Sequence, residues 1–187
     1  MSAALLPTST AGSLPKPSWL AEPETLWSPW KLQGDALVEG KRDALRIAVQ
    51  EQTRRGIDIV SDGEMSKPSY TTYIRHRVDG IQMDPRAAEK GRDIMIGNDL
   101  LAHPDFAGRR RNFSDSPFPG CVGPLKYKDR SALDRDLAHL KAAAAKSKPA
   151  DVFMTAPSPG ILTRFIINLH YPTEDAYVAA LADMMKT

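Results

Sequence analysis

Cysteine is almost absent from this sequence, which has 187 residues and the single cysteine Cys121. One cysteine cannot form a disulfide within its own chain, so a disulfide-stabilised fold is excluded and a reducing, cytoplasmic location is expected. An excess of charge is also missing, because 25 lysines and arginines stand against 23 aspartates and glutamates. The resulting net charge of +2 gives no electrostatic reason to expect a nucleic-acid partner.

Long apolar runs are missing as well. No stretch approaches the ~18 consecutive apolar residues that indicate a membrane-spanning helix, so no membrane partner is expected. Residues 1–6 are apolar but lack the basic segment of a signal peptide. The sequence contains no Walker loop and no GxGxxG motif, so nothing in it predicts a nucleotide site.

Clustered metal ligands are the fourth absence. The four histidines are scattered, and none has another histidine or a cysteine two to four residues away. Pairs at that spacing are typical of zinc sites, so the sequence predicts no metal ligands. Cys121 lies in an apolar, glycine-containing segment, which favours a buried structural thiol over a metal ligand.

Segments typical of strands and helices alternate along the chain. Apolar periodicity predicts helices near residues 35–55, 68–78, 131–144 and 172–184, and strands near residues 5–13, 57–60, 122–127 and 151–155. Residues 80–120 are rich in proline and charge and are expected to form an excursion with short strands of its own. This order predicts an α/β fold with a parallel sheet and right-handed crossovers.

The number of strand–helix units suggests an incomplete barrel. About four units are predicted, which is half of the eight that close a TIM (β/α)₈ barrel. We therefore expect residues 1–187 to form a single domain, the N-terminal half of such a barrel. Because a half-barrel leaves strand edges and an apolar helix face uncovered, a second copy or the missing half is expected to close it.

Three loops at predicted strand ends carry the candidate chemistry, because function in parallel α/β folds sits where strands end. The loop at residues 8–13 offers backbone N–H groups and a hydroxyl to a carboxylate or phosphate, or is only a structural turn. The loop at residues 61–67 offers two carboxylates, which could bind an ammonium group or serve in acid–base catalysis. Alternatively, it is only a turn that caps a helix. The loop at residues 155–160 suits a rigid pocket wall. The predicted substrate-binding residues are Gly12, Ser13, Asp62, Glu64 and Ser158.

Together the first two loops predict a site for a zwitterion such as an amino acid. The sequences of residues 10–17, 60–68 and 153–160, in this order, resemble the catalytic domain of the cobalamin-independent methionine synthase family, including its shorter single-barrel relatives. The resemblance implies a TIM barrel that transfers a methyl group from a methylated folate, or a simpler donor, to the thiolate of homocysteine. It also implies that Gly12 and Ser13 hold the amino-acid carboxylate and that Glu64 holds the amino group. Asp62 replaces a histidine that is usual in the long enzymes, and its role stays open.

The chain departs from this family in its metal ligands. The resemblance implies a zinc ion held by a His-x-Cys pair, a glutamate and a distant cysteine, and His-x-Cys does not occur here. Zinc is thus expected in the full-length family but its ligands are absent from this chain, so these residues alone are expected not to transfer methyl groups. Two alternatives remain. One is a thiol-alkylating relative such as epoxyalkane:coenzyme M transferase, whose substrate has a sulfonate and no amine. The other is a non-catalytic half-barrel that binds a small molecule or serves in assembly.

Overall fold

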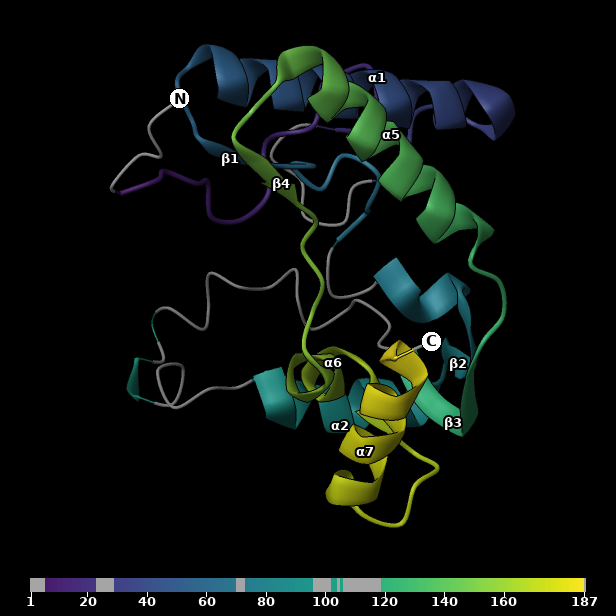
Figure 1. The fold of residues 1–187 in the computed structure, drawn as a ribbon. Helices are drawn as coiled ribbons and strands as arrows, with labels where there is room; N and C mark the ends of the chain where they lie inside the picture. The colour runs from purple at the N-terminus through teal and green to yellow at the C-terminus, as the bar shows by residue number, and fades with distance from the viewer. Residues whose placement is uncertain are drawn as a thin grey trace. The chain divides into compact units, whose positions relative to one another are not determined.

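The structure is a computed structural model that describes residues 6–22, 29–69, 73–95, 102–103, 105 and 119–186. The chain divides into two compact units. Unit 1 comprises residues 1–70 and 130–156, and unit 2 comprises residues 71–129 and 157–187. Figure 1 shows that each unit combines an earlier and a later stretch of the chain. The expectation of one domain over residues 1–187 stays a prediction.

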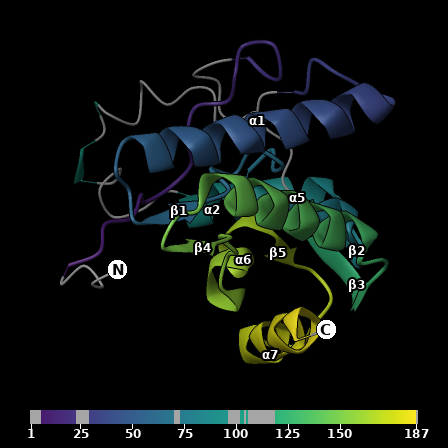
Figure 2. The same ribbon diagram turned by 45° about the horizontal axis from the view of Figure 1, so that its top comes forward.

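Unit 1 contains two long helices and a small parallel sheet. The helices are α1 (Gly34–Arg54) and α5 (Ser131–Ser147), which run side by side in Figures 1 and 2. Strand β1 (Ile59–Ser61) pairs in parallel with β4 (Asp151–Phe153), with Val60 opposite Val152. Ser9 adds an isolated parallel bridge to Ile59. The carboxyl ends of β1 and β4 therefore lie at the same edge of this sheet.

The core of unit 1 lies where α1 meets α5 and the sheet. Apolar residues recur in α1 at intervals of three and four, which places them on one face of the helix. Burying them removes apolar surface from water, worth about 25 cal/mol per Å². The buried core residues are Leu20, Ala44, Leu45, Ala48, Val49, Val60, Met65, Leu140 and Ala143.

Unit 2 contains a mixed sheet with helices around it. Strand β2 (Val78–Met83) pairs antiparallel with β3 (Pro119–Tyr127), and β3 pairs in parallel with β5 (Ile167–Asn168). The helical elements are the 3-10 helix η1 (Tyr73–His76) and the α-helices α2 (Pro85–Met95), α6 (Pro159–Phe165) and α7 (Glu174–Met185). None of the described helices is long and apolar enough to cross a membrane.

The core of unit 2 is centred on Tyr177 of α7. Its ring is fully buried and stacks on Tyr171 with 5.7 Å between centroids. Its hydroxyl donates a hydrogen bond to the carbonyl oxygen of Ile166 at 2.8 Å, so the polar end of the side chain is satisfied inside the core. The buried residues of this core are Ile74, Val78, Cys121, Leu162, Ile166, Tyr177, Leu181 and Met184.

The structure confirms the α/β class and most predicted elements. The helices that include residues 35–54, 131–144 and 174–184 are present, as are strands at residues 59–60, 122–127 and 151–153. The first predicted strand, residues 5–13, is reduced to the bridge at Ser9, and residues 1–5 lie outside the described residues. The excursion at residues 80–120 holds the end of β2, α2 and the start of β3, while most of residues 96–118 lie outside the described part.

Two expectations about local structure and pairing were wrong, and one helix was missed. The described part of residues 68–78 holds the short η1 and the first residue of β2 in place of the predicted helix. Helix α6 was not predicted, although Ser158 and Pro159 are a standard helix start. The predicted strands do not make one parallel sheet among the described residues. They form a two-stranded and a three-stranded sheet, and the β2–β3 pair is antiparallel.

Candidate functional site

The loop that follows Ser9 is joined to the loop that follows β1. The amide of Leu14 donates to the carbonyl oxygen of Gly63 at 3.2 Å, which ties residues 10–17 to residues 61–67. Gly12 has a φ of +81°, a conformation that glycine adopts without steric cost. Gly12 and Ser13 are both exposed, so their backbone N–H groups and the Ser13 hydroxyl are accessible to a ligand.

A side chain of α1 fixes the geometry of both loops. The amide oxygen of Gln52 accepts hydrogen bonds from the backbone N–H of Ser61 and from the hydroxyl of Thr10, each at 3.0 Å. Its amide nitrogen donates to the carbonyl oxygen of Ser61 at 2.9 Å. Gln52 is buried, so these bonds satisfy polar groups that water cannot reach. The end of β1 and the start of the first loop are thereby held to one helix.

The turn after β1 has an unusual backbone. Gly63 and Glu64 both have left-handed backbone angles, with φ of +60° and +59°. For Glu64 this conformation costs about 1 kcal/mol, because its Cβ crowds the following carbonyl. A Cβ added at Gly63 would lie 3.2 Å from the Cβ of Ala48 and 3.2 Å from Leu14 Cδ1. Strain of this kind is often retained where a side chain must point in a particular direction.

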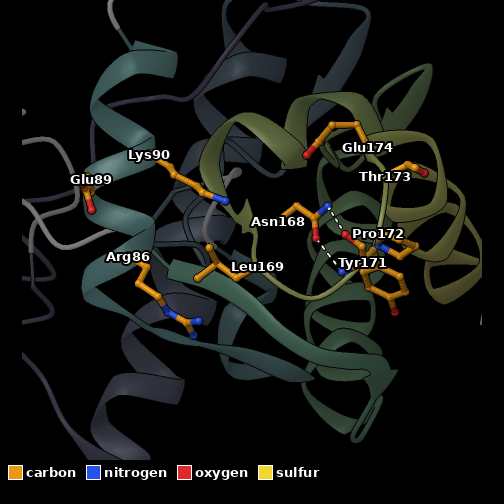
Figure 3. A pocket seen from close by; sticks show the side chains of 9 residues that line it. All are labelled: Arg86, Glu89, Lys90, Asn168, Leu169, Tyr171, Pro172, Thr173 and Glu174. Atoms are coloured by element: carbon orange, nitrogen blue, oxygen red, sulfur yellow. Dashed lines mark hydrogen bonds between the residues drawn. The ribbon is translucent and has the colours of Figure 1, made fainter.

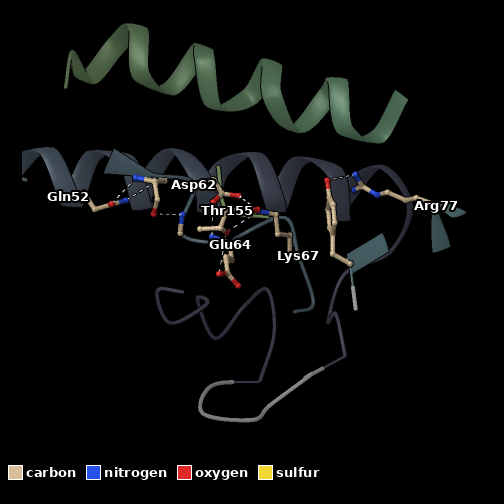
Figure 4. A network of polar contacts seen from close by, with 9 residues as sticks. Gln52, Asp62, Glu64, Lys67, Arg77 and Thr155 are labelled. Atoms are coloured by element: carbon tan, nitrogen blue, oxygen red, sulfur yellow. Dashed lines mark hydrogen bonds and ion pairs between the residues drawn. The ribbon is translucent and has the colours of Figure 1, made fainter. Parts of the chain in front are cut away.

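Buried charges meet at this turn, as Figure 4 shows. Asp62, Lys67 and Glu64 expose only 0%, 1% and 6% of their surface. The Nζ of Lys67 lies 3.1 Å from Asp62 Oδ2, and it donates to the carbonyl oxygen of Thr155 at 2.7 Å and to Thr155 Oγ1 at 3.3 Å. The Thr155 hydroxyl donates to Glu64 Oε1 at 3.3 Å. Thr155 follows β4, so two adjacent strand ends contribute to one network.

Glu64 keeps one carboxylate oxygen available. Among the described residues, Oε2 of Glu64 has no hydrogen-bond partner, and no cation lies within ion-pair distance of this carboxylate. Lys16 is half-buried nearby, and burial lowers the pKa of its ammonium group while Glu64 and Asp62 oppose that shift. A nearly buried carboxylate with one unpaired oxygen is suited to accept hydrogen bonds from a ligand ammonium group.

The five predicted site residues fall into both units. Gly12, Ser13, Asp62 and Glu64 lie in unit 1, on the two joined loops. Ser158 lies in unit 2, where its hydroxyl accepts a hydrogen bond from the backbone N–H of Ile161 at 3.2 Å and caps α6. That cap gives Ser158 a structural role which sequence reasoning missed. The substrate-binding role of all five residues stays a prediction.

Sequence reasoning also missed Gln52, Lys67 and Thr155. Lys67 lies inside the loop at residues 60–68 but was not singled out, because lysine is usually exposed. Thr155 is 88 positions further along the chain, and only the parallel pairing of β1 with β4 brings it to Lys67. Gln52 lies on the buried face of α1, and that polar residue among apolar neighbours was the available signal.

The residues described here do not fit a zinc site. No group of three or more histidine, cysteine, aspartate and glutamate side chains in the described part could hold a metal ion. Cys121 is buried, donates to the carbonyl oxygen of Gly123 at 3.4 Å, and has its pKa raised to about 11 by burial. A zinc-bound cysteine must be a thiolate, and this environment favours the protonated thiol.

Two cavities lie away from the predicted site residues. One of about 730 Å³ belongs to unit 2, and Figure 3 shows Lys90 of α2 and Glu174 of α7 among its lining residues. Another of about 370 Å³ lies in unit 1 between α1 and α5, with Arg46 and His139 among its lining residues. Their linings include none of the five predicted site residues.

The chain resembles known proteins over nearly its whole length. No protein-family model matches the chain. The chain is similar to a methionine synthase from Sulfolobus acidocaldarius, with 25% identity over 91% of this chain and 43% of that protein. It is also similar to a methionine synthase from Pyrococcus furiosus, with 26% identity over 97% of this chain and 46% of that protein. A solved B12-independent methionine synthase from Shewanella sp. W3-18-1, in complex with selenomethionine, is 33% identical with a TM-score of 0.72, over 98% of this chain and 48% of that chain. The chain belongs to the cobalamin-independent methionine synthase family.

The match covers the chain almost completely but its relatives only in part. The chain spans about half the length of the methionine synthases it matches. Nearly all of unit 1 and unit 2 is therefore family sequence, and a comparable length of each relative has no counterpart here. The family relationship supports a methionine synthase-type enzyme.

Proposed function

We propose that this chain carries the amino-acid-binding part of a methyltransferase that moves a methyl group from a methylated folate, or a simpler donor, to the homocysteine thiolate. The observation that carries the proposal is the Glu64 carboxylate, which is nearly buried and keeps Oε2 without a protein partner among the described residues. The family relationship supports it, since the chain is similar to methionine synthases over nearly its full length. Homocysteine and methionine carry the ammonium group that such a carboxylate would bind.

Each of the two joined loops binds one end of the amino acid. Glu64 accepts hydrogen bonds from the substrate ammonium group, and the accessible N–H groups and hydroxyl at Gly12 and Ser13 donate to its carboxylate. The Leu14–Gly63 backbone bond sets the distance between the two loops, so the zwitterion is held at both ends. Orienting the amino acid in this way presents its sulfur in a fixed position, which is how positioning accelerates a bimolecular transfer.

Zinc would supply thiolate activation in the complete family enzyme. The residues described here do not fit that ion, so no step of the present mechanism depends on it. We propose that ligands for zinc come from outside these 187 residues and that the chain alone binds the amino acid without transferring methyl groups. A polypeptide corresponding to the rest of the relatives is the partner this implies.

Calorimetry on the purified chain tests the proposal. Methionine should bind, and Glu64→Gln should weaken that binding at least tenfold, because the variant removes the charge that faces the ammonium group. Glu51→Gln is the matched control, since Glu51 is partly exposed and pairs with Arg54 and Arg55 at the end of α1. Metal analysis should find no stoichiometric zinc. Equal methionine affinity in Glu64→Gln and the unchanged chain would contradict the assignment.

Coenzyme M separates the proposal from the thiol-alkylating alternative. It has a thiol and a sulfonate but no amine, so the Glu64 carboxylate should not improve its binding. We expect coenzyme M to bind much more weakly than homocysteine to the same preparation. Tighter binding of coenzyme M would instead favour an epoxyalkane:coenzyme M transferase-like role, and binding of neither thiol would favour an assembly subunit.

A further inference from the structure

Lys67 is a fully buried lysine, which requires a physical reason. Removing an ammonium group from water is costly unless its charge is paired and its N–H groups are hydrogen-bonded. Here Asp62 Oδ2 lies 3.1 Å from Nζ and supplies the opposite charge, while the carbonyl oxygen and the hydroxyl of Thr155 accept hydrogen bonds at 2.7 and 3.3 Å. The side chain therefore joins the strand end at Asp62 to the strand end at Thr155.

The hydrogen-bond direction through Thr155 is determined by Lys67. An ammonium group has only donors, so Thr155 Oγ1 must act as the acceptor towards Lys67. The single hydroxyl hydrogen of Thr155 is then free to point to Glu64 Oε1, which lies 3.3 Å away. Asp62, Lys67, Thr155 and Glu64 thus form one chain of polar contacts with a fixed direction, drawn in Figure 4. Such chains polarise each member and strengthen the individual bonds.

This chain of contacts defines the charge and the orientation of the Glu64 carboxylate. Asp62 is opposed by Lys67, so its charge does not compete for a ligand ammonium group. Glu64 receives only a neutral hydroxyl on Oε1, and its Oε2 has no hydrogen-bond partner among the described residues. The positive φ of Glu64 sets the direction in which its side chain leaves the backbone. The hydrogen bond from the Thr155 hydroxyl limits the rotation of the Glu64 carboxylate. One oriented carboxylate oxygen remains without a hydrogen-bond partner among the described residues, beside the half-buried Lys16.

We propose that Lys67 and Thr155 are positioning residues, which hold Glu64 so that the site prefers a thiol or thioether carrying an ammonium group over the same molecule without it. The proposal rests on the proposed function, since it concerns how Glu64 recognises the amino end of the substrate. Neither residue contacts the substrate in this scheme. Thr155 orients the carboxylate, and Lys67 orients Thr155 and neutralises Asp62.

A pair of Thr155 variants tests the orienting role in the full chain. Thr155→Val replaces the hydroxyl by a methyl group of similar size, and Thr155→Ser is the conservative control that keeps the hydroxyl. The probes are methionine and 4-(methylthio)butanoate, which differ only in the amino group. We expect Thr155→Val to weaken methionine binding about tenfold and to leave binding of the des-amino compound within about twofold, so that amine preference falls. Thr155→Ser should restore that preference. An equal loss for both probes, or no loss, would overturn the proposal.

A second measurement needs no ligand and isolates the buried ion pair. The urea-unfolding free energies of Asp62→Asn, Lys67→Met and the double variant form a cycle. Each single variant leaves an uncompensated buried charge, so we expect the double variant to be at least as stable as either single variant. If the losses of unfolding free energy in the two single variants simply add in the double variant, the role of Lys67 is overturned. If the Asp62–Lys67 pair is coupled but the chain binds no methionine, the proposed function and the amine preference are both overturned. If methionine binds and Thr155→Val leaves its affinity unchanged, the positioning role alone is overturned.

Discussion

The side-chain amide of Gln52 bonds to both backbone groups of Ser61, accepting from its N–H at 3.0 Å and donating to its carbonyl oxygen at 2.9 Å. A helix side chain thus occupies the position that another strand residue would take beside β1. Because Gln52 also accepts from the Thr10 hydroxyl, it couples α1 to both loops of the candidate site. This side chain therefore lies where β1 ends and the Asp62–Lys67 turn begins.

Replacing Gln52 by leucine should destabilise unit 1. The variant removes both partners of Ser61 and leaves buried backbone groups unsatisfied, which costs about 1–3 kcal/mol for each group. We expect a loss of about 3 kcal/mol in the free energy of unfolding, measured by urea denaturation. Gln50→Leu, on the exposed face of the same helix, is the matched control and should change stability by less than about 0.5 kcal/mol. Similar losses for both variants would contradict the structural role of Gln52.

Gly63 should not tolerate a side chain. Alanine there would adopt a φ of +60° and place its Cβ 3.2 Å from Ala48 Cβ and Leu14 Cδ1. The backbone alone costs about 1–2 kcal/mol, so Gly63→Ala should lower the unfolding free energy by at least that amount. Gly160→Ala provides the comparison, because nothing lies within 4 Å of its added Cβ. A Gly63→Ala variant as stable as Gly160→Ala would argue against this turn.

Cys121 should be unreactive while the protein is folded. Burial raises the pKa of its thiol to about 11, so at about pH 8 almost no thiolate is present in the folded state. Since the thiolate is the nucleophile, an aromatic disulfide reagent should label the native protein far more slowly than the urea-unfolded protein. Labelling at the same rate in both states would show that the thiol is accessible.

The same thiol makes stability depend on pH. A cysteine in the unfolded chain releases its proton near the ordinary pKa of 9.0, whereas folded Cys121 keeps its proton up to a pKa of about 11. Between these values the unfolded state binds fewer protons, so stability falls as pH rises. We expect the unfolding free energy of the unchanged protein to drop more between about pH 8 and 11 than that of Cys121→Ala, measured in urea at each pH. Parallel pH profiles would contradict the raised pKa.

The Tyr177 hydroxyl should contribute to the stability of unit 2. It donates to Ile166 inside the core, and burial raises its pKa well above the usual range for tyrosine. Tyr177→Phe leaves the carbonyl oxygen without that donor, so a loss of about 1–2 kcal/mol in unfolding free energy is expected. Tyr127→Phe, a partly buried tyrosine on β3, serves as the comparison. No difference between the two variants would show that the hydrogen bond is unimportant.

The sequence by itself determined the elements whose pattern is local. The buried face of α1 recurs every three to four residues, and the strands at β1 and β4 are short apolar runs, so their type follows from side-chain periodicity. The loops at residues 10–17 and 60–68 indicated the family, because their residue types and order can be recognised in the linear sequence. Each of these conclusions depends only on neighbours along the chain.

The tertiary structure decided which distant residues meet. The pairing of β1 with β4 brings Thr155 to Lys67 and so creates the contact with Glu64, a relationship that no linear motif records. It also gave Ser158 a helix-capping role, placed β2 antiparallel to β3, and divided the described chain into two units. Strand pairing and burial depend on contacts between residues far apart in sequence. Periodicity can identify the type of an element, but it does not specify which other element lies beside it.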